Sequence, residues 1–464
     1  MSKAVVHPQD RKGLRLKIYS RYALVILSEG AVCAVSAAKA VTATLSRKSL
    51  VVSYFIGAAL FNGIASAAEI NRPDLPPPAQ VERALDEHLL VLNANSGLKM
   101  EQANQRKWNS GNYEFNLRAG TAQRNISNTG QHLKEWDVAL ERPLRLFNKV
   151  GIDENIGATG VAHAEYALDD ARHEASRTLL KLWFNWQREQ SQSTLWQHQI
   201  TILQQQSQMA EKRVKAGDAP KLELNQALAA SAQAGVSWHQ AQMRAQLAKT
   251  ELMRQFPAVQ LPDSFTITAP QAIEQNLSYW KSRMLDDNHE LGMAQAQNHL
   301  QQLLAQRSRA DQVPDPTVGI RHANEMGGNE KVTGVYISVP LSFGQRGAMA
   351  ENLAQQAAMT ADQAAFVQRR LENDSYATHL QAVKTYETWQ QAHAAATAIR
   401  SNAELVAKAY RLGESSLSDS LTAQRFALES SLSESIAQLD ANEARYRLLL
   451  DAHQLWVFDE APAK

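Results

Sequence analysis

Residues 213–227 have the sequence RVKAGDAPKLELNQA, and residues 409–423 have the sequence AYRLGESSLSDSLTA. Each stretch places a glycine, Gly217 or Gly413, between two segments with helical composition, and the two glycines are 196 residues apart. Glycine accepts the positive φ with which one helix ends before the next begins. The two stretches therefore predict the same helix–turn–helix in each half of the chain.

A second pair of stretches repeats at nearly the same offset. Residues 138–147 have the sequence VALERPLRLF and residues 335–344 the sequence VYISVPLSFG, which places Pro143 and Pro340 197 residues apart. Two matches at nearly one offset indicate an internal duplication. We expect a first repeat over 68–256, a linker over 257–270 whose three prolines break any helix, a second repeat over 271–456 and a tail over 457–464.

Four stretches alternate apolar and polar residues, as where Val335, Ile337 and Val339 alternate with Tyr336 and Ser338. Period two predicts strands with one apolar face, and runs of about ten residues have the length of a tilted membrane strand. The alternative is an ordinary soluble sheet. The strands are expected over about 113–123, 135–147, 316–323 and 331–343.

Very long helices follow each strand pair. Between Gly160 and Val214 no proline or glycine occurs, and about 55 residues at 1.5 Å each make a helix of about 80 Å. Such a helix needs partners along its whole length, because the packing of its apolar stripe supplies most of its stability. We expect a helical bundle or coiled coil and not an isolated globular core.

If the strands cross a membrane, one chain is incomplete. Lipid offers no partner to an unpaired strand edge, so the sheet must close into a barrel, and the smallest common barrels have about eight strands. Two chains would supply eight strands and three chains twelve. Eight leave an interior filled by side chains, whereas a larger barrel leaves an aqueous lumen. A conduit therefore favours at least three chains.

The N-terminus has the pattern of a secretion signal. Arg47 and Lys48 precede the apolar run 50–64, and Ala65 and Ala67 follow it as an A-x-A cleavage site. We expect residues 1–67 to be an N-terminal extension with a signal peptide that is cleaved after the small residues. The alternative is an uncleaved membrane anchor, which the shortness of the run disfavours.

Composition excludes several classes of function. The 48 basic and 47 acidic residues nearly cancel, which argues against a nucleic-acid partner held by bulk charge. The single cysteine, Cys33, excludes disulfide scaffolds and cysteine-based metal sites. None of the thirteen histidines forms HExxH or an i, i+4 pair, so we expect dispersed surface histidines, no resident metal and no cofactor. No catalytic constellation is recognisable, and the chain is predicted not to be an enzyme.

Taken together, the doubled elements resemble the TolC-like outer-membrane efflux factor family over about residues 79–455. The motifs that carry the resemblance are ERPLRLF at 141–147, VPLSFGQR at 339–346 and the two glycine turns. DPTVGI at 315–320 followed by VPLSFGQRG is similar to the CzcC-like branch that serves heavy-metal pumps. Each motif is short, and their repetition in the same order makes the resemblance specific.

The resemblance implies a mixed α/β membrane protein with four transmembrane strands and very long periplasmic helices in each chain. Three chains would form a twelve-strand β-barrel continued by an α-helical barrel. Its place would be the outer membrane of a Gram-negative bacterium, with a periplasmic helical domain and outer-membrane lipid around the barrel. The implied partners are two further copies of the chain, a periplasmic adaptor and an inner-membrane proton-driven pump.

The family pattern also assigns roles at the glycine turns. Gly217, Gly413, Asp218 and Glu414 would form the periplasmic tip that contacts the adaptor. Glu223 and Asp419, six residues after each glycine, would line the closed inner mouth, where a ring of carboxylates favours cations. The alternative is a solvated helix end, since acidic residues in a first turn interact favourably with the helix dipole.

The function expected from these features is an exit duct of a tripartite efflux system, with heavy-metal cations as a candidate cargo. Two alternatives stay open. One is the outer-membrane duct of a type I protein secretion system. The other is a secreted helical scaffold or adaptor without a pore, whose strands form a small soluble sheet. A duct is expected to fractionate with outer membranes, and a scaffold to stay in solution.

Overall fold

The computed structural model describes residues 72–111, 113–341 and 344–456. The predicted signal segment, with Ala65 and Ala67, and the predicted tail over 457–464 lie outside the described residues. Within them, no helix is both long and apolar enough to cross a membrane.

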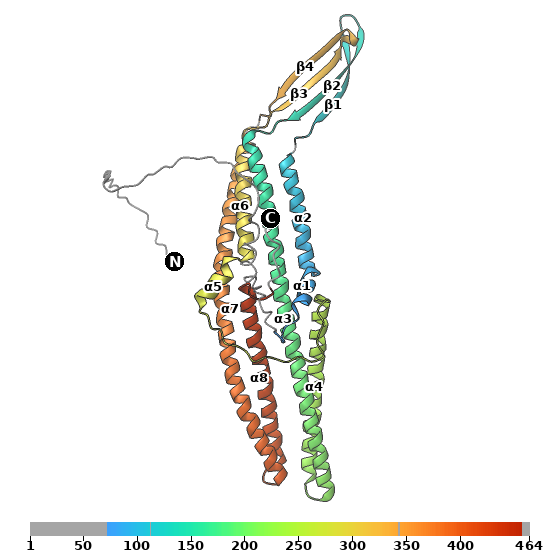
Figure 1. Ribbon diagram of the computed structural model, residues 1–464. Coiled ribbons are helices and arrows are strands. Elements are labelled where there is room, and N and C mark those ends of the chain that lie inside the picture. Colours follow the sequence, from blue (N-terminus) through green and yellow to red (C-terminus); the bar gives the residue numbers. More distant parts are fainter. Residues whose placement is uncertain (1–71, 112, 342–343, 457–464) are drawn as a thin grey trace, which may run out of the picture. The chain divides into compact units, whose positions relative to one another are not determined.

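The same order of elements occurs in both halves of the chain (Figure 1). The first half contains α2 (Leu89–Ser110), β1 (Asn116–Ile126), β2 (Gln131–Pro143), α3 (Phe147–Ala216) and α4 (Lys221–Gln255). The second contains α6 (His289–Ala310), β3 (Thr317–Glu325), β4 (Glu330–Ser338), α7 (Gln345–Leu412) and α8 (Leu417–Asp451). A short helix precedes each half, α1 (Pro78–Asp86) or α5 (Leu277–Asp286), and the 3-10 turn η1 (Met326–Gly328) joins β3 to β4.

The two halves match closely in helix length. Helices α3 and α7 have 70 and 68 residues, and α4 and α8 have 35 residues each. At 1.5 Å per residue, α3 is about 105 Å long, longer than the 80 Å expected from the sequence. Glycines within α3 do not interrupt it: Gly157 and Gly160 pack against Gln105 and Glu101 of α2, where a side chain would be crowded.

One antiparallel sheet contains all four strands in the order β1-β2-β3-β4. The pairing of β2 with β3, from Trp136 opposite Asn324 to Pro143 opposite Thr317, joins the two halves of the chain. Strands β1 and β4 are the edges, and no strand within the described ranges pairs with the outer side of either.

The strand ends differ from the predicted ones by several residues. Strand β1 begins at Asn116 and not near 113, because Tyr113 leaves the ladder: its carbonyl accepts from Nε of Arg142 (2.9 Å) and its hydroxyl donates to Asp315 (3.0 Å). Strand β4 ends at Ser338 and not near 343, since a proline two residues later has no backbone N–H to give. The alternation of apolar and polar residues continues beyond the start of β1 and the end of β4, so it does not reveal where these strands end.

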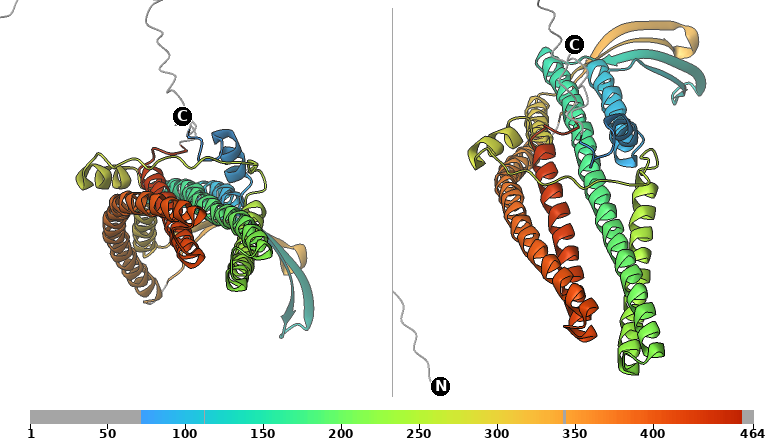
Figure 2. Two further views of the ribbon diagram at one scale, coloured as in Figure 1. Left: turned by 90° about the horizontal axis from the view of Figure 1, so that it is seen from below. Right: turned by 60° about the horizontal axis from the view of Figure 1, so that its bottom comes forward.

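The largest core cluster lies where α3 and α8 meet α1, the start of α2 and the segment after α4. Its largest members are aromatic and leucine side chains, including Leu179, Trp183, Phe184, Leu252, Phe256 and Tyr446. Figure 2 shows the α3–α4 hairpin beside the α7–α8 hairpin, with α3 and α8 adjacent. Trp183 and Trp186 are both buried in this core.

The segment between α4 and α5 is part of the core and not a free linker. Phe256 and Val259 are buried, and the backbone carbonyl of Thr268 accepts from Nδ2 of Asn442 on α8 (2.9 Å). The next helix begins only after Asn276, whose side chain accepts from a backbone N–H of α5. The non-helical stretch is thus longer than the expected 257–270 because side-chain packing, and not proline alone, determines its extent.

Candidate functional site

One face of the sheet carries an exposed apolar band. Leu117, Leu140, Ile320 and Val335 lie opposite one another across all four strands, and they are 72%, 45%, 57% and 83% exposed. Val138, Val318 and Ile337 share this face in the neighbouring rows. A contiguous apolar patch that crosses a whole sheet is a surface for lipid or for another protein.

The opposite face is polar, and its side chains are paired with one another. The Tyr336 hydroxyl donates to Glu141 across the sheet (2.6 Å). Arg124 forms an ion pair with Glu135 (2.6 Å). Alternation along the strands therefore separates a mainly apolar face from a mainly polar, hydrogen-bonded face, as in a strand that has lipid on one side and water on the other.

A buried charge network fixes the sheet to the helices. Lys149, in the first turn of α3, is 0% exposed; its Nζ lies 2.9 Å from Oδ1 of Asp315 and 3.0 Å from Oδ1 of Asp311. It also donates to the carbonyl of Val313 (2.8 Å). Burial alone would raise the pKa of Asp315, but hydrogen bonds from Lys149, the backbone N–H of Leu146 and Tyr113 lower it overall. The network determines how the strands leave the helices.

The two predicted glycine turns lie at the far ends of α3 and α7 from the sheet. Gly217 and Gly413 both have left-handed backbone angles, φ 81° and φ 82°. In each turn the residue after the glycine donates its backbone N–H to the carbonyl five residues earlier. The N–H of Asp218 donates to Arg213 (2.8 Å) and that of Glu414 to Ala409 (2.9 Å). This double hydrogen-bond pattern is the Schellman motif, which only glycine adopts without a steric cost.

The other predicted tip residues differ in environment. Asp218, Glu414 and Asp419 are exposed, whereas Glu223 is partly buried. Asp419 forms a capping box with Ser416 at the start of α8: each side chain accepts from the other residue's backbone N–H. Its carboxylate therefore has a local structural role in the single chain.

Glu223 belongs to a cluster that connects the two hairpins. Its Oε2 lies 3.4 Å from Nη1 of Arg213 and accepts from the hydroxyl of Tyr410 on α7 (3.2 Å). The same Nη1 donates to that hydroxyl (3.0 Å). Burial and the charge of Glu223 raise the pKa of Tyr410. The sequence showed an aromatic residue before only one of the two turns; its partner Arg213, 197 residues earlier, could not be identified from spacing.

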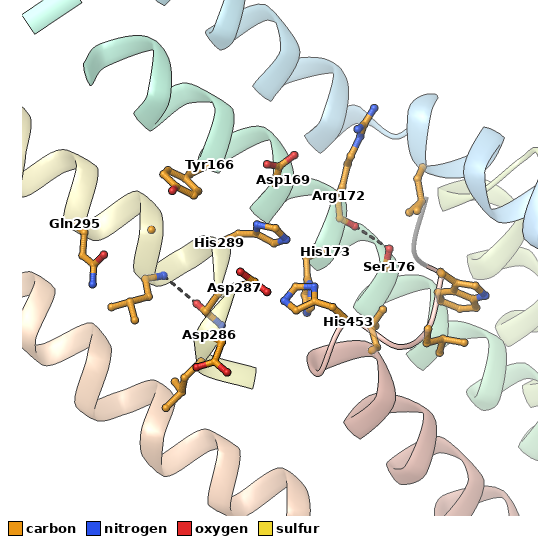
Figure 3. A pocket seen from close by; sticks show the side chains of 18 residues that line it. Tyr166, Asp169, Arg172, His173, Ser176, Asp286, Asp287, His289, Gln295 and His453 are labelled. Carbon is orange, nitrogen blue, oxygen red and sulfur yellow. Dashed lines mark hydrogen bonds between the residues drawn. The ribbon is translucent and has the colours of Figure 1, made fainter. Parts of the chain in front are cut away.

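Three histidines from distant parts of the chain meet beside a cavity of about 830 Å³ (Figure 3). One nitrogen each of His173, His289 and His453 lies within 4.8 Å of the others. They are separated by 116 and 164 residues, so no local sequence motif identifies them as a group. The expectation of dispersed histidines is wrong for these three, because helix packing brings them together.

Comparison with known proteins identifies the fold. No protein-family model matches the sequence, and no curated protein matches it. Solved structures do match. The Campylobacter jejuni CmeC outer membrane channel aligns with a TM-score of 0.65 at 14% identity, over 83% of this chain and 86% of that one. The chain has the fold of outer membrane channels.

Two further structures agree with this assignment. The outer membrane protein VceC from Vibrio cholerae aligns with a TM-score of 0.61 at 16% identity, over 81% of this chain and 95% of that one. The Neisseria gonorrhoeae MtrE outer membrane channel aligns with a TM-score of 0.57 at 14% identity, over 82% and 89%. The predicted resemblance to TolC-like channels is thereby confirmed at the level of the fold.

Proposed function

We propose that this protein is an outer-membrane exit duct of a tripartite efflux system. The observation that carries the proposal is the exposed apolar band of the sheet, bounded by the edge strands β1 and β4, whose outer sides pair with no other strand among the described residues. A sheet with these properties is stable in hydrocarbon only when other chains supply the missing partners. The fold shared with outer membrane channels supports the same conclusion.

Three chains satisfy the requirement for a lumen. Strand β4 of one chain would pair with β1 of the next, which gives a twelve-strand barrel, large enough to enclose water. The apolar band would face lipid, and the opposite face, with Glu141, Tyr336, Arg124 and Glu135, would line the lumen. The paired charges on that face match a polar, water-filled interior.

The helices would extend the lumen into the periplasm. Each chain contributes α3, α4, α7 and α8, and three copies would form a twelve-helix tunnel that ends at the Gly217 and Gly413 turns. We propose that these turns, with Asp218 and Glu414 exposed beside them, contact a periplasmic adaptor and an inner-membrane proton-driven pump. The duct itself would be passive, and heavy-metal cations are the cargo that the sequence resemblance favours.

Cysteine cross-linking tests the assembly. The only native cysteine is Cys33, so a C33S background carrying Thr121→Cys on β1 and Thr333→Cys on β4 reports contacts between edge strands. We expect a thiol-reactive bifunctional reagent to produce covalent dimers and trimers, and no larger species, in isolated outer membranes. The reagent should be long enough to span the two cysteines whatever the register between β4 of one chain and β1 of the next.

The matched control pairs Thr121→Cys with Val138→Cys, which lie on neighbouring strands β1 and β2 of one chain. This pair should cross-link only within a chain and leave monomers on a denaturing gel. The duct would be excluded if the edge-strand pair also gave only monomers while the protein remained soluble without detergent, because the strands would then need no partner chain.

Removal of the predicted constriction carboxylates tests the pore. Changing Glu223 and Asp419 to Ala should lower the cation-to-anion permeability ratio in planar bilayers by on the order of twofold, with the trimer intact, since six negative charges leave the mouth. Asp218→Asn with Glu414→Gln removes six charges from the same tip but not from the predicted constriction. An equal fall in both variants would show that general tip charge, and not a ring at the mouth, sets selectivity.

A further inference from the structure

The three-histidine cluster joins parts of the chain that are remote in sequence. His173 lies in the middle of α3, His289 is the first residue of α6, and His453 follows the last turn of α8. The ring centroids of His289 and His453 are 4.9 Å apart, and those of His173 and His453 are 5.3 Å apart. Figure 3 shows the three rings gathered at one wall of the cavity, with Asp287 beside them.

One imidazole of the cluster has a carboxylate behind it, as metal-binding histidines usually have. Nε2 of His173 lies 3.2 Å from Oδ1 of Asp451, an arrangement in which a carboxylate orients an imidazole and increases its basicity toward a metal. Asp451 is held in turn by Arg177 (2.8 Å) and Arg447 (2.7 Å). The imidazole of His173 is therefore held in place without a bound metal ion.

The cavity beside the cluster also contains a buried nitrogen without a hydrogen-bond partner and several carboxylates. Nε2 of His453 is buried and has no hydrogen-bond partner within the described part of the chain. The cavity is lined by Asp169, Asp286 and Asp287, and by the cation Arg172, whose guanidinium is paired with Asp86 (3.2 Å). A buried nitrogen that lacks a donor or acceptor is costly unless something binds it.

We propose that His173, His289 and His453 bind one Zn²⁺ ion per chain, with the fourth position open to the cavity. At Zn–N distances of about 2.0–2.1 Å, nitrogens on a tetrahedron lie about 3.3 Å apart. The histidine nitrogens already lie within 4.8 Å of one another, so shifts of about 1 Å or less at each ring close the site. Three imidazoles suit Zn²⁺, and ligands from three separate elements impose no square plane such as Cu²⁺ or Ni²⁺ prefers.

The ion would act as a clamp. It would connect the end of α8 to α3 of the first half and to α6 of the second half, near the positions where α5 and the C-terminal segment pack. Zinc binding at this site does not depend on the proposed channel function, because no ligand lies in the sheet or at the glycine turns.

Equilibrium dialysis of the purified full chain in detergent against micromolar ZnCl₂, after removal of metal with a chelator, tests the site. We expect one zinc per wild-type chain and binding at least about tenfold weaker in His289→Ala and His453→Asn, since each removes one of three ligands. Asparagine suits position 453 because the residue has a positive φ of 54°. Cobalt in place of zinc should give the visible absorption of a tetrahedral site.

His299→Ala is the matched control, because this exposed histidine lies on α6 as His289 does; it should bind zinc as the wild type does. Hydrogen exchange of peptides covering residues 450–456 tests the clamp: zinc should slow exchange there in the wild type and not in His289→Ala, a substitution on another helix. Absence of zinc from the wild-type chain, or equal binding by His289→Ala, would overturn the site. Zinc binding without slower exchange would overturn the clamp.

Discussion

Replacing Ile337 with arginine is expected to prevent stable insertion, whereas replacing its neighbour Ser338 with arginine is not. Ile337 is 70% exposed on the apolar face of β4, and Ser338 points to the polar face. An arginine on the lipid face of a barrel costs up to about 2–4 kcal/mol, a cost that falls toward the bilayer surfaces, and a trimer would incur it three times. The same charge on the lumen side remains hydrated.

Outer-membrane fractionation and the heat-resistant trimer on a gel measure this difference. The two variants add the same charge at adjacent positions of one strand. We expect the Ile337 variant to appear as monomer outside the membrane and the Ser338 variant to behave as the wild type. Equal insertion of both would contradict the assignment of the apolar face to lipid and favour a soluble sheet.

Replacing Lys149 with methionine is expected to destabilise the fold by about 1–3 kcal/mol, because the partly buried Asp315 loses its cation while Asp311 keeps Arg307. Methionine keeps most of the unbranched apolar stem, so the main loss is that of the charge and of the hydrogen bonds to Asp315, Asp311 and Val313. Thermal unfolding followed by circular dichroism measures the effect. Lys384→Met removes the cation of an exposed ion pair with Glu387 and should leave the melting temperature unchanged.

A second substitution separates the charge network from simple packing. In Lys149→Met, Asp315→Asn should recover part of the lost stability, since it removes the uncompensated charge while keeping an acceptor for Leu146. The pKa of Asp315 is lowered in the folded chain from its ordinary value of 3.8. Its contribution is therefore complete at neutral pH and is lost as the pH falls below about 3.8 through the folded pKa. Failure of Asp315→Asn to rescue would show that the lysine acts through packing alone.

Local features of the sequence were sufficient for the architecture. Gly217 and Gly413 mark the two turns because glycine adopts the left-handed conformation at a helix end without the steric cost that other residues carry. The alternation that identified four strands depends only on neighbouring residues. The ends of those strands were wrong by several residues, because Tyr113 alternates in step with β1 yet is drawn out of the ladder by Arg142 and Asp315.

Tertiary structure alone decided which side chains meet. Lys149 contacts a carboxylate 166 residues away, Tyr410 contacts one 187 residues away, and the three histidines come from three separate helices or their ends. Spacing carries no information over such separations, since packing of α3, α7 and α8 sets the relative rotation and register of each helix. The sequence by itself determined the elements and their order, because propensity, periodicity and turns act locally; contacts between elements were decided by the packing of the whole chain.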